Sequence, residues 1–284
     1  MEKIIGVVIL YHPQEPALTR NINSYLEFVD KIIIVDNSEP TADIDFSCFS
    51  SKAILIADND NKGIAFRLNQ AAQIAIEAGA SWLLTMDQDS SFTSSNLQLY
   101  ERCFEKLEDT KEIAMIGVEH SRQEALSDCS FVFTSELITS GSLINLAVFS
   151  ALGGFDENLF IDEVDTEYCF RALIKGYKTI KFPHVVLQHS LGELQDHYSL
   201  KTLKKTARIL HSPIRLYYMV RNHLYINKKY GQQIPEELKK RRKAVLNMVK
   251  NNLLYGKNKL KLIHLLILGY CDYRRPRMGK FDAK

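Results

Sequence analysis

The sequence lacks the cysteine patterns that stabilise small secreted proteins or bind zinc. Its five cysteines, Cys48, Cys103, Cys129, Cys169 and Cys271, are scattered over 284 residues and include no C-x-x-C pair. An odd and unclustered set argues against a disulfide framework and against a zinc site. We therefore expect reduced thiols in a cytoplasmic protein.

The sequence also lacks a hydrophobic run long enough to cross a membrane. The apolar stretch LIHLLILGYC at residues 262–271 has about half of the length that a spanning helix needs. The opening residues, MEKIIGVVILYHP, contain a short apolar run but no small-residue cleavage site, so we expect a first β-strand and no signal peptide. We find no internal repeat and no low-complexity segment.

Basic residues are scarce in the first 200 positions and concentrated after them. Residues 1–200 contain 14 Lys and Arg against 30 Asp and Glu, whereas residues 201–284 contain 22 against 4. A basic tail on an acidic body indicates an anionic surface as partner, either lipid headgroups or nucleic acid. The alternative is a solvated helical face that partly neutralises the acidic body.

What the sequence does contain is a series of apolar runs of strand length. The runs IIGVVIL, KIIIVDN, AILIADN, WLLTMDQD and IAMIGV are rich in Ile and Val, as strands buried on both faces are. Helical patterns separate them, one stopping at Gly79 and one opened by Ser94 or Ser95. The alternation predicts an α/β protein with a mostly parallel central sheet flanked by helices, which binds ligands at the carboxyl ends of its strands.

We predict two domains, at residues 1–200 and 201–284; the alternative is that the C-terminal helices pack back on the sheet. The second is a basic helical region, in which residues 199–210 (SLKTLKKTARIL) and 235–268 have helical patterns. Pro213 and Pro235 are expected to interrupt the helical segments of this region.

Asp87 and Asp89 are two carboxylates one residue apart at the end of an apolar run. Held together, they repel unless a cation or a proton offsets their charge. Oxygen ligands of this kind suit Mg²⁺ or Mn²⁺, which take their remaining ligands from substrate phosphates and water. The alternative is a loop with an Asp helix cap. We expect one polar crevice to collect the residues at the strand ends, namely Asp36, Asn37, Asp58, Asn59, Asp87 and Asp89.

A second acidic cluster lies in GGFDENLFIDEVDTEYCFRALIKGY, residues 153–177. Asp165 stands near the first turn of a helix-like run, where the helix dipole stabilises a carboxylate. It is a candidate general base that accepts a proton from a substrate hydroxyl, and a plain N-cap is the alternative. The density of acids indicates an oriented acidic pocket, made by Asp156, Glu157, Asp162, Glu163, Asp165 and Glu167.

Two further residues are candidates for ligand binding. His189 follows a strand-like run, and a neutral imidazole can bind a metal or a phosphate, although a structural role is equally compatible. Arg221 lies in the aromatic-rich YYMVRNHLYI, where a guanidinium suits a diphosphate. Stacking on Tyr217 or Tyr218 is the alternative for Arg221.

The order of these motifs resembles a known family. ILYH, VDN, NDNKGIAFRLNQA, DQDS, TSGSLIN, GGFDENLFIDEVDTEYCFR, HSLG and YYMVRN follow one another along residues 3 to 230. Together they are similar to the inverting GT-A glycosyltransferases of family 2, and among these to bacterial rhamnosyltransferases with a D-Q-D-S signature. The tail is similar only loosely.

The resemblance implies a Rossmann-like fold that binds a nucleotide sugar. Asp36 and Asn37 would contact the base or the ribose of the nucleotide. Asn61, Gly63 and Asn69 match the family's loop beside the nucleotide.

The resemblance also implies roles in metal binding and catalysis. Asp87 would lie near the ribose and a metal-bound water, and Asp89 would bind the cation that joins the two donor phosphates. His189 matches a residue that completes the metal site. Asp165 falls at the position of the catalytic base, but Val164 stands before it where many relatives have Glu, which leaves Asp162 as a rival base.

The implied activity is metal-dependent, inverting transfer of a sugar such as rhamnose from a dTDP- or UDP-sugar. The acceptor would be a hydroxyl of a glycan or a lipid-linked acceptor in cell-surface polysaccharide synthesis. We expect a cytoplasmic protein that contacts an anionic membrane through its basic tail, binds no nucleic acid and can form a homo-oligomer.

Two other functions compete with this one. Haloacid-dehalogenase-like phosphatases also carry D-x-D after an apolar strand, but there the pair lies near the chain start, whereas here three strands precede it. A nucleic-acid binder could use the basic tail, but the sequence has no RNP-like or zinc signature.

Overall fold

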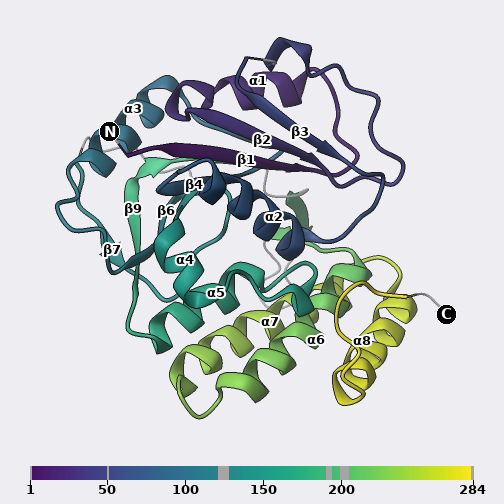
Figure 1. Ribbon diagram of the computed structural model, residues 1–284. Coiled ribbons are helices and arrows are strands. Elements are labelled where there is room, and N and C mark those ends of the chain that lie inside the picture. The colour runs from purple at the N-terminus through teal and green to yellow at the C-terminus, as the bar shows by residue number, and fades with distance from the viewer. Residues whose placement is uncertain (1, 50, 121–127, 190–193, 199–204, 283–284) are drawn as a thin grey trace. The chain divides into compact units, whose positions relative to one another are not determined.

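The contacts of the chain divide it into two units (Figure 1). The computed structural model describes residues 2–49, 51–120, 128–189, 194–198 and 205–282. We call Met1–Phe160 with Val164–His189 the sheet unit, and Ile161–Glu163 with Ser190–Lys284 the helical unit. We predicted a domain boundary near residue 200. In the structure the helical unit begins at Ser190 and also includes Ile161–Glu163, which lie within the acidic segment 153–177.

The described part of the sheet unit is built around eight strands in the order β3-β2-β1-β4-β8-β6-β9-β7. The β3, β2, β1 and β4 strands are parallel to one another, and β6 is parallel to β9. The β8 strand is antiparallel to both of its neighbours, β4 and β6, and β7 is antiparallel to β9. The predicted mostly parallel α/β sheet is therefore confirmed. The strands are β1 (Ile4–Leu10), β2 (Lys31–Asp36), β3 (Ala53–Ala57), β4 (Trp82–Asp87), β6 (Ile113–Glu119), β7 (Val132–Phe133), β8 (Ser142–Asn145) and β9 (Lys178–Val186).

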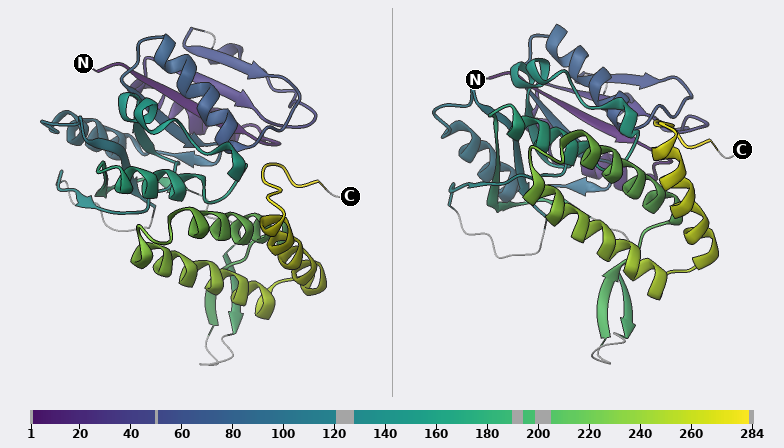
Figure 2. Two further views of the ribbon diagram at one scale, coloured as in Figure 1. Left: turned by 60° about the horizontal axis from the view of Figure 1, so that its bottom comes forward. Right: turned by 90° about the horizontal axis from the view of Figure 1, so that it is seen from below.

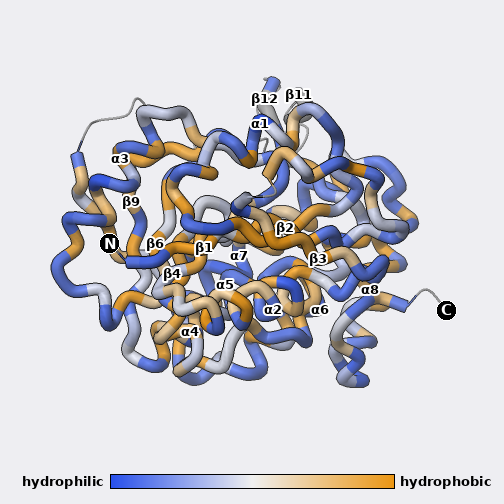
Figure 3. Tube along the Cα trace, turned by 45° about the horizontal axis from the view of Figure 1, so that its top comes forward, coloured by the Kyte–Doolittle hydropathy of each residue, from blue (hydrophilic) through white to orange (hydrophobic). Residues whose placement is uncertain are grey.

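Register brings the carboxyl ends of the parallel strands to one edge. Asp87 of β4 is opposite Ile9 of β1, and Asp36 of β2 is opposite Leu10. The β1 and β2 strands are mainly apolar along their length, as Figure 3 shows. The β3 strand lies at the edge of the sheet and is partly exposed, so the expectation of burial on both faces does not hold for it.

Helices pack on both faces of this sheet because alternate strand residues point to opposite faces. The α1 and α3 helices share a core with one set of strand residues, including Val8, Ile34 and Leu84. The α2 helix contacts β1 and β4, and α5 contacts β6 and β9. The helices are α1 (Ala17–Asn23), α2 (Ile64–Glu77), α3 (Ser94–Glu105), α4 (Leu146–Leu152) and α5 (Val164–Ile174), with 3₁₀ turns at Leu26–Phe28, Ser47–Phe49 and Glu157–Leu159.

Two local predictions in this unit are wrong. The N-cap of α3 is Thr93, whose hydroxyl accepts the amide of Asn96, because the chain turns into the helix one residue before Ser94. Cys103 and Cys129 form a disulfide, so the expectation of reduced thiols fails for this pair. Spacing along the chain could not show it, because the fold brings together cysteines that are 26 residues apart.

The helical unit consists of a hairpin and three helices in its described part (Figure 2). These are β11 (Leu194–Tyr198), β12 (Lys205–Ile209), α6 (Pro213–Tyr230), α7 (Pro235–Tyr255) and α8 (Lys259–Arg274). Leu216 and Met219 of α6 and Leu262 of α8 form its core, and Met248 of α7 packs against them.

The helix expected at residues 199–210 is wrong for Lys205–Ile209. This segment pairs with β11 in an antiparallel ladder, which satisfies its backbone hydrogen bonds and overrides the helical propensity of its Lys and Arg residues. Residues 199–204 lie outside the described part. The segment 235–268 is helical as expected but breaks between α7 and α8, where Asn258 adopts a left-handed conformation. Within the described residues, no helix combines the length and hydropathy of a membrane span.

Candidate functional site

The D-Q-D turn at the end of β4 is held in place by its middle residue. The side-chain amide of Gln88 accepts the Tyr11 N–H at 2.8 Å and donates to the Tyr11 carbonyl at 3.1 Å. Asn21 of α1 donates to the Gln88 carbonyl at 3.0 Å. Asp87 and Asp89 flank this anchored residue and are both exposed. The turn therefore presents two carboxylates from a fixed backbone.

A second set of contacts joins this turn to the chain around residue 189. Ser140 Oγ accepts the Asp87 N–H at 3.3 Å and donates to Ser90 Oγ at 2.8 Å. The short strand β10 (Gln188–His189) pairs with β5 (Ser90–Ser91), with His189 opposite Ser90. The backbone of His189 thus lies beside the residue that follows Asp89, while its side chain lies outside the described part.

These residues fit a divalent cation that takes its remaining ligands from a bound substrate. Among the described side chains, no three of His, Cys, Asp and Glu group as a metal site. Mg²⁺ and Mn²⁺ sites commonly use one or two protein carboxylates with phosphate oxygens and water. Asp87 and Asp89 supply two such carboxylates at an exposed turn. The donor set therefore suits a metal–phosphate ligand better than a metal held by protein alone.

The loop after β2 is organised by Asp36. Its carboxylate is buried and accepts the backbone amides of Ser38 at 2.9 Å and Ala42 at 2.6 Å. Asn37 donates to Asn61 Oδ1 at 2.9 Å, which ties the loop after β2 to the loop after β3. The predicted nucleotide contacts of Asp36, Asn37 and Asn61 stay predictions, and the structure does bring the three residues to one edge of the sheet.

Arg67 of α2 is a residue that the sequence interpretation missed. It is fully buried, donates to Asn37 Oδ1 at 3.0 Å and forms an ion pair with Asp58. Its guanidinium holds the pKa of the Asp58 carboxyl well below the usual range. The signal was present, because position 67 lies on the apolar stripe of α2 between Ile64 and Ala71, where an Arg needs a partner.

The start of α2 depends on Gly63 and Phe160. Gly63 has φ +84°, and its N–H donates to Asn61 Oδ1 at 3.1 Å. The next amide, that of Ile64, donates to the Phe160 carbonyl at 2.6 Å. A Cβ at position 63 would overlap the Phe160 ring and lie 2.6 Å from the Phe160 oxygen. This contact connects the predicted nucleotide loop to the chain that leads to Asp165.

We expect Gly63→Ala to destabilise the protein more than Gly79→Ala does. Both positions have positive φ, which costs an L-residue about 1–2 kcal/mol. A Cβ at Gly79 would meet nothing within 4 Å, so Gly79→Ala is a matched control for backbone strain alone. Urea unfolding of both variants measures the difference. Equal losses of unfolding free energy would show that the contact with Phe160 does not constrain this turn.

Asn69 links α2 to the approach of α5. Its amide donates to the Phe155 carbonyl at 3.0 Å and to Glu157 Oε1 at 2.8 Å, and its oxygen accepts the Phe155 N–H at 2.8 Å. These bonds show a structural role for Asn69. The predicted contact with a nucleotide is not tested by them.

Asp165 lies in the first turn of α5, as predicted, and is partly buried. It accepts the Thr166 amide at 2.8 Å. Burial first, and then the Asp165 charge, raise the pKa of the Cys169 thiol one turn later, so this thiol stays protonated beside the carboxylate. Glu167 points elsewhere, into a buried ion pair with Arg171 at 2.7 Å.

Three of the six acids of this cluster have cationic partners of their own, which a run of acids in sequence cannot show. In the helical unit, Asp162 pairs with Arg215 of α6 at 2.6 Å, and the fully buried Glu163 pairs with Arg241 of α7 through both of its oxygens. We call Ile161–Glu163 the clamped segment.

The backbone of the clamped segment is also restrained. Asn222 of α6 donates to the carbonyls of Ile161 and Asp162, both at 2.9 Å. Asp162 and Glu163 have φ values of +61° and +66°, which non-glycine residues adopt only when their surroundings impose them. Side chains of α6 and α7 therefore determine the conformation of the three residues that precede Val164 and Asp165.

The contacts of Arg221 match the stacking alternative rather than a diphosphate site. It is fully buried in the helical unit, where its guanidinium stacks on Tyr217 and Tyr218 at 5.2 and 5.0 Å from the ring centroids. It also donates to the Gly279 carbonyl at 2.9 Å. The structure favours the stacking alternative, and we leave Arg221 out of the proposed donor site.

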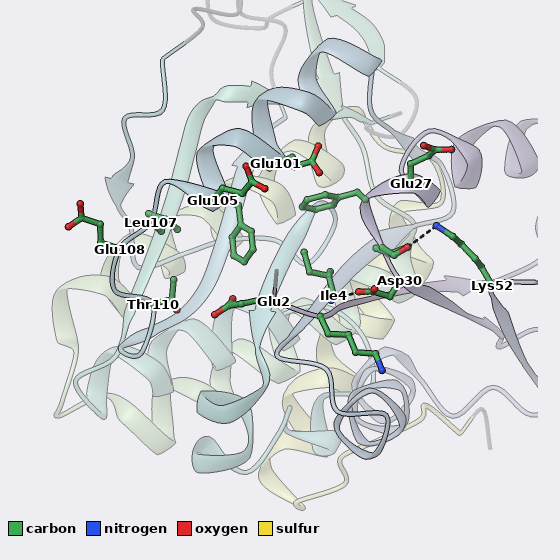
Figure 4. Close-up of a pocket in the computed structure, with 14 residues that line it drawn as sticks. Glu2, Ile4, Glu27, Asp30, Lys52, Glu101, Glu105, Leu107, Glu108 and Thr110 are labelled. Atoms are coloured by element: carbon green, nitrogen blue, oxygen red, sulfur yellow. Dashed lines mark hydrogen bonds between the residues drawn. The ribbon is translucent and has the colours of Figure 1, made fainter.

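A cavity of about 850 Å³ lies at the opposite end of the sheet unit, beside the start of β1 (Figure 4). It contains none of the predicted site residues, and acidic side chains dominate the charged part of its lining. Such a lining repels phosphate groups, so this cavity is no candidate for a nucleotide. Its charged residues are Glu2, Lys3, Glu27, Asp30, Lys52, Glu101, Glu105 and Glu108.

Comparisons with known proteins support the resemblance seen in the motifs. No protein-family model matches the sequence. The chain is 27% identical over 295 aligned positions to the dTDP-rhamnosyl transferase RfbF of Shigella flexneri, and the match covers 97% of each protein.

Solved structures show the fold. The crystal structure of GalNAc-T7 with UDP, GalNAc and Mn²⁺ matches 90% of the chain with a TM-score of 0.54 and 11% identity. S. aureus TarS residues 1–349 in complex with UDP-GlcNAc match 95% with a TM-score of 0.56 and 14% identity. The chain spans 58% of the GalNAc-T7 chain and 80% of the TarS fragment, but 49% of a longer TarS chain. The fold is that of the GT-A glycosyltransferases.

Proposed function

We propose that this chain, which has a dTDP-rhamnosyl transferase as a relative over nearly its whole length, is a metal-dependent inverting glycosyltransferase. The observation that carries the proposal is the convergence of two features at one edge of a GT-A sheet. The exposed carboxylates of the D-Q-D turn lie there, and so does the start of α2, which binds the chain five residues before Asp165. A dTDP-sugar is our first choice of donor and a UDP-sugar the second.

The chemistry divides between two groups of residues. Asp87 and Asp89 would hold Mg²⁺ or Mn²⁺, which when bound offsets charge on the departing nucleoside diphosphate. Asp165 accepts the proton of the acceptor hydroxyl while that oxygen attacks the anomeric carbon from the face opposite the diphosphate. The new C–O bond forms as the bond to the diphosphate breaks, and a single displacement inverts the configuration.

The contacts of Asp162 with Arg215 argue against Asp162 as the base. Both oxygens of Asp162 are bound by the Arg215 guanidinium, so this carboxylate is already engaged by a side chain of α6. Asp165 combines partial exposure with a position in the first turn of α5.

The acceptor in this proposal is a hydroxyl of a glycan or of a lipid-linked acceptor, met in the cytoplasm at an anionic membrane. The disulfide between Cys103 and Cys129 is the observation against a cytoplasmic site, because disulfides are rare there. Titration of free thiols in protein isolated from the cytoplasm decides this point. Three free thiols per chain would show that the disulfide forms in the cytoplasm, whereas five would show that Cys103 and Cys129 are reduced there.

The proposal is tested by ligand-dependent stability. We expect a dTDP-sugar with Mn²⁺ to raise the melting temperature, since a ligand at a hundred times its Kd stabilises the native state by about 2.7 kcal/mol. Asp89→Ala should remove the Mn²⁺-dependent part of the shift, while Asp109→Ala, which changes an exposed carboxylate elsewhere, should not. UDP- and GDP-sugars, RNA and DNA complete the screen. Stabilisation by RNA alone would refute the proposal, and an unchanged Mn²⁺ effect in Asp89→Ala would remove Asp89 from the metal site.

A further inference from the structure

The α8 helix exposes a row of large apolar side chains. Leu260, Ile263, Ile267 and Tyr270 are 85%, 46%, 59% and 50% exposed. Their spacing of three, four and three residues places them along one side of the helix. A row of this kind on a helix surface marks an interaction site more often than four apolar residues scattered singly do.

The opposite side of α8 is already occupied within the helical unit. Leu262 and Leu265 are buried, and Leu262 packs in a core with Leu216 and Met219 of α6. Gly269 lies against Tyr217, whose carbonyl would be 3.1 Å from a Cβ at that position. The α8 helix therefore has apolar side chains on two sides, one buried and one exposed, and an exposed apolar face of this kind is normally covered by protein or by lipid.

Cations surround the exposed row. Lys257, Lys259 and Lys261 are exposed at the start of α8, and Arg274 and Arg275 are exposed at its end. The α7 helix carries two further exposed leucines, Leu246 and Leu254, in a segment rich in Lys and Arg. Since residues 201–284 contain 22 basic and 4 acidic residues, the occupant of this surface has to be both apolar and anionic.

An anionic lipid surface meets both conditions. Apolar side chains of an interfacial helix enter the boundary between headgroups and acyl chains, while Lys and Arg contact the headgroups. Nucleic acid would pair with the cations but leave the apolar row in water. A second copy of this chain would bring two strongly basic surfaces together, which like-charge repulsion opposes.

We propose that α8 is an interfacial helix, which binds an anionic membrane surface through Leu260, Ile263, Ile267 and Tyr270. The sequence indicated an anionic partner from charge alone, and the structure identifies the side chains that enter the lipid. The proposal deepens the proposed function, because it places the enzyme where a lipid-linked acceptor would lie. It does not depend on catalysis, since binding to vesicles needs neither donor nor acceptor.

The test is co-sedimentation with vesicles of phosphatidylcholine alone or mixed with phosphatidylglycerol. We expect the full chain to pellet with the mixed vesicles at low salt and much less with neutral ones. Leu260→Glu and Ile267→Glu should each weaken binding at least tenfold, because each removes an apolar side chain from lipid and adds a negative charge. Lys259→Gln should weaken it about fivefold. Leu55→Glu, at an exposed apolar position on β3, should have no effect.

Circular dichroism and the melting temperature verify that each variant is folded. No pelleting at low salt would overturn the proposal, and so would an equal loss in Leu55→Glu. A concentration-dependent dimer that Ile267→Glu abolishes, without vesicle binding by the parent chain, would assign the row to self-association instead. Vesicle binding by a chain that shows no response to nucleotide sugars would separate this proposal from the proposed function.

Discussion

Asp165→Asn is expected to lower the rate of sugar transfer by a factor of about 10²–10⁴ while leaving donor affinity nearly unchanged. Asn keeps the shape of the side chain and can still accept the Thr166 amide through its oxygen, but it cannot take a proton from the acceptor hydroxyl. Initial rates at saturating donor and acceptor measure the first effect. Donor-dependent shifts in melting temperature measure the second.

The control for this prediction is Asp162→Asn. Its amide oxygen can still accept a hydrogen bond from Arg215, so we expect a small loss of activity that arises from the clamped segment rather than from proton transfer. A large rate loss in Asp162→Asn together with near-normal activity in Asp165→Asn would transfer the role of base to Asp162. The pH–rate profile separates the two outcomes, because only loss of the base removes its limb from the profile.

Arg241→Ala is expected to lower the free energy of unfolding by about 3–5 kcal/mol. Glu163 is fully buried, and removing its cationic partner leaves a charge in a site that water cannot reach. Arg242→Ala is the matched control, because the neighbouring side chain is exposed and a surface substitution of this kind changes stability by less than about 0.5 kcal/mol. Urea unfolding of the two variants gives the comparison.

A double variant tests the cause of this loss. Glu163→Gln with Arg241→Met removes both charges, so it should recover most of the stability that Arg241→Ala loses. Arg241→Lys keeps the charge but not the paired geometry, and an intermediate value is expected. If Arg241→Ala and Arg242→Ala lose the same small amount, the ion pair with Glu163 contributes nothing to holding the clamped segment.

The main strands were predictable because strands buried in a sheet consist of nearly continuous runs of apolar residues. Five apolar runs became β1, β2, β3, β4 and β6. Four of these strands are covered on both faces, so no polar side interrupts the run, and the edge strand β3 is apolar although it is partly exposed. The β8 strand escaped, although it lies between β4 and β6, because SLIN is short and partly polar. The hairpin of β11 and β12 escaped for a different reason: its stability lies in backbone pairing, which side-chain patterns do not report.

The sequence predicted where the candidate site residues lie in the strands and helices, but not which side chains they pair with. Asp87 at a strand end and Asp165 in the first turn of a helix follow from local pattern. The pairing of Glu163 with Arg241 joins residues 78 positions apart, and nothing in either neighbourhood indicates the other. Consequently a run of acids looked like one pocket in the sequence, whereas the fold assigns several of them to separate cations.

The bonds of Gln88 have a consequence for the proposed binding of a cation at this turn. Because the Gln88 amide both accepts from and donates to the backbone of Tyr11, it restrains the backbone of the turn that carries the two flanking aspartates. Preorganisation of this kind reduces the conformational entropy that binding would otherwise remove. It also limits what evolution can place between the two acids: a side chain that both donates and accepts, and that is long enough to reach the neighbouring strand.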